Sequence, residues 1–96
     1  MENKYTEIFK LKEMLEKENI EFGFSNLSVG SKILYQIGYN KINKYIIVLQ
    51  GRYTYGGLQD LLQVKIADTK KNTEYDEYFL TAKEVYGIIK NNSMEK

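Results

Sequence analysis

The sequence predicts a single α+β domain, in which an antiparallel sheet of about four strands is flanked by an N-terminal and a C-terminal helix. Apolar residues recur at helical spacing near both ends of the chain, and between these segments they alternate with polar residues. Short stretches rich in asparagine, glycine and lysine separate the alternating segments, as antiparallel turns do. The predicted order is therefore α-β-β-β-β-α over residues 1–96, with residues 1–4 and 93–96 expected to fray.

The first helix is predicted over residues 5–17, where apolar side chains recur at steps of three and four. Residues 20–25 then alternate between apolar and polar side chains, which predicts a half-buried strand. Residues 26–31 contain serine and glycine and are expected to form a turn.

A second alternation over residues 33–39 predicts the next strand, and the asparagines in residues 40–43 are compatible with a hairpin. Residues 45–49 are apolar on both faces and rich in β-branched side chains, which suits a central strand. After a glycine pair, alternating leucine, valine and isoleucine predict a fourth strand that ends near Asp68.

The last helix has the clearest start signal in the chain. Thr81 can cap the helix, and Glu84 three residues later completes a capping box. Leu80 before the cap and Val85 after it fit a hydrophobic staple. We expect the polar residues 69–74, which precede this helix, to form a solvated loop.

Composition restricts the classes of function. Cysteine and histidine are absent, which removes thiol nucleophiles, thiolate metal sites and the commonest general base. Fourteen basic residues against thirteen acidic ones give a formal charge of +1, so no strong field for nucleic acid is expected. No apolar run approaches the ~20 residues of a membrane span, and the polar start is unlike a signal peptide. We expect a cytoplasmic protein.

The segment with the greatest functional potential follows the apolar residues 45–49. It holds the only arginine, two tyrosines, a glycine pair and an amide–carboxylate pair. Arginine supplies a planar fork of donors, tyrosine supplies stacking area, and glycine lets a ligand approach the backbone. Such a turn could bind a phosphate, a nucleotide or a protein loop, or could simply connect two strands. Its candidate binding residues are Arg52, Tyr53, Tyr55, Gly56, Gly57, Gln59 and Asp60.

Tyrosine is abundant, with nine residues in the chain. Tyrosine enrichment is a feature of interface cores, which predicts a homo-oligomer; alternatively, tyrosine replaces other aromatic residues in a small sheet. Lysines beside strand tyrosines also resemble single-strand nucleic-acid surfaces, but the near-neutral charge and single arginine disfavour this class. The residues concerned are Lys32, Lys41 and Lys44 with Tyr35, Tyr39 and Tyr45.

The acidic residues offer no recognisable catalytic or metal-binding set. The acids near the end of the chain lack EF-hand spacing and are expected in the solvated loop beside two lysines. A chain of this length also has little room to enclose a substrate cleft. We therefore expect a protein that is not an enzyme, with no catalytic residues, no metal and no cofactor. The acids considered are Asp60, Asp68, Glu74, Asp76 and Glu77.

Two motifs resemble a known group of proteins. They are Tyr-Gly-Gly-x-Gln-Asp-Leu-Leu at residues 55–62 and Leu-Thr-Ala-x-Glu-Val-Tyr at residues 80–86. The chain resembles small uncharacterised proteins encoded in phages and prophages of low-GC Gram-positive bacteria, and the order of elements is similar over most of its length. The resemblance implies a phage accessory protein that acts by stoichiometric binding on a host protein such as a CRISPR nuclease, or on a nucleotide signal.

The leading hypothesis is a non-enzymatic, anti-CRISPR-like protein that binds and inhibits a host factor through residues 52–60. One alternative is a sponge for a nucleotide signal, with Arg52 on the phosphate and Tyr53 or Tyr55 on the base. A further alternative is a structural, oligomerisation or single-strand nucleic-acid-binding protein.

Overall fold

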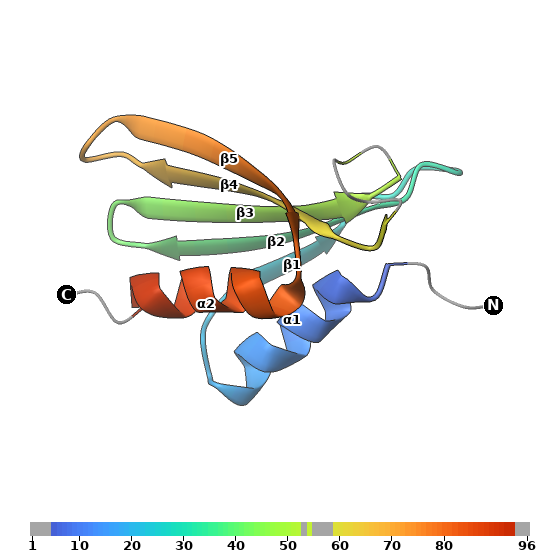
Figure 1. Ribbon diagram of the computed structural model, residues 1–96, viewed down its shortest axis with the longest axis horizontal. Helices are drawn as coiled ribbons and strands as arrows, with labels where there is room; N and C mark the ends of the chain where they lie inside the picture. The colour runs from blue at the N-terminus through green and yellow to red at the C-terminus, as the bar shows by residue number, and fades with distance from the viewer. Residues whose placement is uncertain (1–4, 53, 55–58, 94–96) are drawn as a thin grey trace.

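The computed structural model describes residues 5–52, 54 and 59–93. Within these residues the chain forms a five-stranded antiparallel sheet, with one helix before it and one after it in the sequence, and the order of the strands in the sheet follows their order in the sequence (Figure 1). The predicted α+β fold with one helix at each end is therefore confirmed. The elements are α1 (Glu7–Lys17), β1 (Gly23–Asn26), β2 (Leu34–Lys41), β3 (Lys44–Gly51), β4 (Leu62–Asp68), β5 (Thr73–Leu80) and α2 (Ala82–Ser93).

The sheet has five strands, where the sequence predicted about four. The expected solvated loop shrinks to a turn at residues 69–72, which Asp68 closes by accepting hydrogen bonds from the backbone N–H groups of Lys70 and Lys71 at 3.0 and 3.1 Å. Strand β5 then runs antiparallel to β4. Nearly every residue of β5 is exposed, so its sequence lacks the alternation that marks a half-buried strand.

Both helices pack on the same face of the sheet (Figure 1). Strand side chains alternate between the two faces, and those of Ile46, Val48 and Gln50 in β3 are buried on the side of the helices. The other core residues come from α1, β2, β4 and α2. They are Ile8, Leu11, Leu15, Ile37, Tyr39, Leu62, Val64, Ile66, Ala82, Val85 and Ile89.

The opposite face of the sheet, called the open face below, has no helix over it in the described part of the chain (Figure 1). Tyr45, Ile47 and Leu49 of β3 alternate with the buried residues and therefore point to this face. Tyr45 is 42% exposed. The prediction that this strand is apolar on both sides is confirmed, but a helix covers only one of them.

The predicted start of the last helix is also confirmed. The Glu84 backbone N–H donates to Thr81 Oγ1 at 3.3 Å, and the Thr81 N–H donates to Glu84 Oε1 at 3.0 Å. This reciprocal pair is the capping box, and it begins α2 at Ala82. Val85, on the first turn, is fully buried, and Leu80 packs against the same core.

Candidate functional site

The predicted binding segment follows β3 at one end of the sheet. Arg52 is exposed, and its backbone N–H donates to the carbonyl oxygen of Ile33 at 3.0 Å. A Cβ on Gly51 would lie 2.2 Å from that oxygen, so this position requires glycine. Thr54 Oγ1 accepts from the Gly51 N–H and donates to the Gly51 carbonyl, both at 3.0 Å, which closes the turn. Tyr53, Tyr55, Gly56 and Gly57 lie outside the described residues.

Asp60 caps the N-terminus of α1. Its Oδ1 accepts hydrogen bonds from the backbone N–H groups of Thr6 at 2.7 Å and Glu7 at 3.1 Å, and the Thr6 hydroxyl donates to Oδ2. Thr6 itself makes no side-chain cap to its own helix, so a carboxylate 54 residues away replaces that cap. The negative charge also lies at the positive end of the helix dipole.

Gln50 completes this cap from inside the molecule. Its side chain is fully buried; Oε1 accepts the Ile8 N–H at 3.0 Å, and Nε2 donates to Asp60 Oδ1 at 2.7 Å. Among the described residues, every buried side-chain nitrogen and oxygen has a hydrogen-bond partner. Sequence reasoning missed Gln50, although an amide at the end of an apolar strand signals a buried polar group that needs partners.

The environment of Asp60 fixes its charge state. Partial burial acts to raise the pKa of Asp60, but the hydrogen bonds that Thr6, Glu7 and Gln50 donate outweigh burial and hold the pKa below its ordinary value of 3.8. Asp60, the acidic residue of the predicted binding segment, therefore caps the N-terminus of α1. Arg52 and Gln59 are the exposed members among its described residues, and their role in binding stays a prediction.

The two helices are joined by polar contacts at both of their ends. Glu7 Oε1 accepts the Ala82 N–H at the start of α2 at 2.9 Å. Near the end of α1, Glu18 Oε1 accepts from the Tyr86 hydroxyl at 2.8 Å and lies 3.5 Å from Lys90 Nζ. The Tyr86 hydrogen bond and, after it, the Lys90 charge lower the pKa of Glu18. These contacts hold the two helices in position relative to each other.

An apolar groove of about 400 Å³ lies on the open face, beside the turn that holds Thr54. One rim is the segment between β1 and β2, in which the Leu27 N–H donates to the Leu34 carbonyl at 2.8 Å. Two apolar side chains on this rim are exposed, Leu27 at 46% and Val29 at 74%. The groove therefore presents apolar surface next to Arg52. Its lining residues are Leu27, Val29, Lys32, Ile33, Leu34, Leu49, Thr54 and Gln63.

The tyrosines divide between the core and the surface. Tyr39 is buried, and the Tyr35 ring packs edge-on against Phe9, with 5.0 Å between the ring centroids. The surface considered for single-strand nucleic acid, which would combine these tyrosines with Tyr45, is not formed, because alternation along β2 turns Tyr35 and Tyr39 toward the helices. Sequence reasoning also missed the exposed aromatic residues of β5. These are Tyr75, Tyr78 and Phe79.

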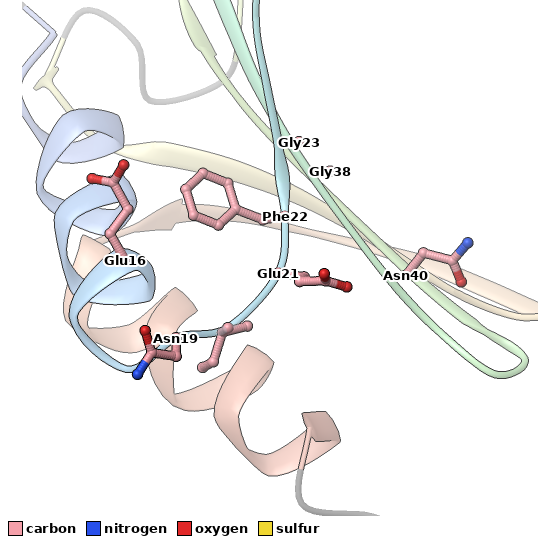
Figure 2. Close-up of a pocket in the computed structure, with 8 residues that line it drawn as sticks. Glu16, Asn19, Glu21, Phe22, Gly23, Gly38 and Asn40 are labelled. Carbon is pink, nitrogen blue, oxygen red and sulfur yellow. The ribbon is translucent and has the colours of Figure 1, made fainter.

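A wider hollow of about 770 Å³ lies where α1 leads into β1 (Figure 2). Figure 2 shows that Phe22 points toward α1, whereas Glu21 lies on the other side of the connecting segment. Glu16 and Asn40 enter from α1 and β2. These polar side chains do not converge on one point. The hollow therefore has the volume of a ligand site but no set of polar groups that would fix a ligand in one orientation.

The described residues contain no group of three acidic side chains that could hold a metal ion. Neither helix in the described ranges combines the length and the hydropathy of a membrane span. Comparison with known proteins gave no matching family model, no matching curated protein and no matching solved structure.

Proposed function

We propose that this chain is a non-enzymatic phage-type accessory protein that binds a host protein and inhibits it by covering a functional surface. The observation that carries the proposal is the apolar groove on the open face, with Leu27 and Val29 exposed at its rim. Apolar side chains in this position are hydrated in the free protein. A partner that covers them gains about 25 cal/mol for each Å² of apolar area removed from water.

The lining of the groove favours an apolar anchor from another protein. Lys32, Thr54 and Gln63 are its polar members, and leucine, isoleucine and valine make up the rest. Protein interfaces concentrate their binding energy in apolar or aromatic anchors that fill such pockets inside a polar rim. Positive charge from Lys32 and the neighbouring Arg52 matches a partner whose anchor is flanked by carboxylates.

The class of partner rests on the resemblance to phage and prophage proteins. Accessory proteins of this size act by stoichiometric binding, and a component of the host defence, such as a CRISPR nuclease, is the target class that we propose. The groove supports this mode of action because it offers contact area and charge complementarity for a macromolecule.

The test compares the groove with an exposed apolar position elsewhere. The variant Leu27→Asp/Val29→Asp places charge on the rim, and Ile42→Asp is the control, because Ile42 is 72% exposed at the β2–β3 turn. The readout is plaque formation by a CRISPR-sensitive phage on a host that expresses the chain. We expect the groove variant to reduce plaque rescue about tenfold or more and the control to retain it.

Melting temperatures of both variants establish that each is folded. Full rescue by the folded groove variant would remove the groove from the proposal. Loss of rescue in the control as well would show that the charge, rather than its place, matters.

A nucleotide sponge is the alternative that the exposed Arg52 beside the groove keeps open. A nucleotide that binds the folded chain must stabilise it by about 2.7 kcal/mol at a hundredfold excess over its Kd. We expect a thermal-shift screen of mononucleotides and cyclic nucleotides to give no stabilisation. A nucleotide that raises Tm in the parent and not in Arg52→Ala would replace the inhibitor proposal by the sponge.

A further inference from the structure

The edge strand β5 presents a second uncovered surface, apart from the groove. Among the described residues β5 pairs with β4 alone and forms one edge of the sheet, and only its last residues approach a helix, where the chain leads into α2 (Figure 1). Seven of its eight residues are exposed, including Tyr75 at 54% and Phe79 at 53%. An exposed edge strand carries unpaired backbone donors and acceptors, which form a template for another strand.

A bulge interrupts only one end of this edge. Phe79 has a φ of +61°, a left-handed conformation that strains a bulky side chain, and the register with β4 shifts between Leu62 and Val64. Such bulges turn an edge away from other strands. Residues 73–77 nevertheless keep regular pairing with β4, from Asp68 opposite Thr73 to Val64 opposite Glu77. A regular edge is therefore available at residues 73–77.

This regular edge is acidic. β5 contains Glu74, Asp76 and Glu77 and no basic residue. Alternation and the register with β4 place Glu74 and Asp76 on the open face, beside Lys65, whose Nζ lies 3.0 Å from Glu74 Oε1. Tyr75 and Glu77 point to the side of the helices. The strand thus combines a carboxylate row on one face with an exposed aromatic ring on the other.

A second copy of the chain is a poor match for this edge. In the twofold antiparallel pairing of residues 73–77 with the same residues of a second copy, Glu74 of each copy lies opposite Asp76 of the other. Like charges directly opposite each other destabilise a strand pair. The charge on the edge therefore selects a strand of different composition, with basic side chains at these places.

We propose that β5 binds a basic extended segment of another protein by strand addition. Lysine or arginine at alternate positions of that segment pairs with Glu74 and Asp76 on the open face, and apolar residues between them pack against Tyr75. Backbone hydrogen bonds to residues 73–77 supply the strand pairing, and the alternating side chains supply its specificity. This surface adds to the groove and does not depend on it.

The probe is a capped hexapeptide of alternating lysine and valine, titrated at low salt into the ¹⁵N-labelled full chain. We expect amide shifts at residues 73–77, with Leu27 and Val29 unchanged, and slower hydrogen exchange of the edge amides. The same peptide with every backbone nitrogen methylated keeps its charge but loses its donors, and its affinity should fall about tenfold or more. Equal binding of both peptides, or shifts that centre elsewhere, would overturn strand addition.

Charge reversal tests the site on the protein. Glu74→Lys/Asp76→Lys should weaken binding of the lysine–valine peptide about tenfold or more, and Glu13→Lys/Glu21→Lys, which makes the same change in net charge at exposed places, should leave it within about twofold. Equal losses in both variants would reduce the interaction to long-range attraction and overturn the proposal. If the edge variant does not fold, the comparison of the methylated and unmethylated peptides still tests strand addition on the unaltered protein. The plaque test of the groove stands apart from either result.

Discussion

At the scale of single residues, the position of Asp60 determines what its substitution can report. The carboxylate lies in the predicted binding segment, yet its oxygens already accept hydrogen bonds from Thr6, Glu7 and Gln50. A substitution there changes the stability of the fold before it changes any contact with a partner. Arg52, which is exposed, is the residue of this segment whose substitution tests binding more directly.

Asp60→Ala is expected to destabilise the protein by about 2–3 kcal/mol. It removes the acceptor for two N-terminal amides of α1 and leaves the amide of buried Gln50 without this partner. Asp60→Asn keeps one oxygen for these donors and should cost about 1 kcal/mol or less. Urea unfolding of the two variants measures the difference. Equal, small losses would mean that α1 does not need this cap.

The same carboxylate predicts a dependence of stability on pH. The pKa of Asp60 in the folded protein is below its ordinary value of 3.8, so its ionised form stabilises the fold at higher pH. This contribution is complete above the ordinary value and is lost as pH falls through the folded-state pKa. We expect the stability of Asp60→Asn to fall less steeply than that of the parent protein between neutral pH and about pH 2. Parallel pH profiles of unfolding would contradict this role.

The sequence identified the polar character of this segment but not its contacts. The sequence makes Asp60 and Arg52 both candidates, because the segment combines the only arginine and a carboxylate with two tyrosines and a glycine pair. Asp60 contacts the rest of the protein and Arg52 is exposed because of packing between segments 54 residues apart. Local sequence patterns do not encode such packing. Gln50 was missed for the same reason, since its partners lie in α1 and in the turn before β4.

At the scale of elements, the sequence predicts structure that depends on neighbouring residues but not structure that depends on long-range pairing. The start of α2 was predictable because Thr81 and Glu84 lie within one turn of each other. Strand β5 was not, because it gains its structure by pairing with β4 and buries almost nothing. A strand without a buried face leaves no periodic signal in its sequence.

Thr81→Ala is expected to cost about 0.5–1 kcal/mol, the lower part of the range for a lost cap. The reason is that Glu7 accepts the Ala82 N–H, so the first turn of α2 keeps one acceptor. Combining Thr81→Ala with Glu7→Ala should cost about 0.5 kcal/mol more than the sum of the single changes. A double-mutant cycle from thermal or urea unfolding measures this coupling. Strictly additive losses of stability would mean that the two caps act independently.

At the scale of the whole molecule, the two faces of the sheet are covered unequally. Both helices lie on one face of the sheet, while Tyr45, Ile47 and Leu49 of β3 point to the open face. Leu49 also lines the groove, so the apolar stripe along β3 continues into the proposed binding surface. In the absence of a target, pairing of two open faces about a twofold axis is the simplest way to cover this stripe.

We therefore expect a dimer in light scattering at micromolar concentrations. Tyr45→Lys should shift the population to the 11.3 kDa monomer because it places charge in the stripe. Tyr75→Lys, on β5, is the matched aromatic control and should leave the dimer in place. A parent protein that scatters only as a monomer would contradict self-association, and a dimer that only Tyr75→Lys disperses would move the contact to the sheet edge.

The cap on α1 also has a consequence for the order of folding. Helix α1 is the first element of the chain, but the carboxylate that completes its N-terminus is 54 residues further along. Closing a loop of that length costs chain entropy that local hairpins such as β2–β3 do not incur. We expect the hairpins to nucleate the sheet and α1 to dock after the transition state. Asp60→Ala should then accelerate unfolding and leave the refolding rate nearly unchanged.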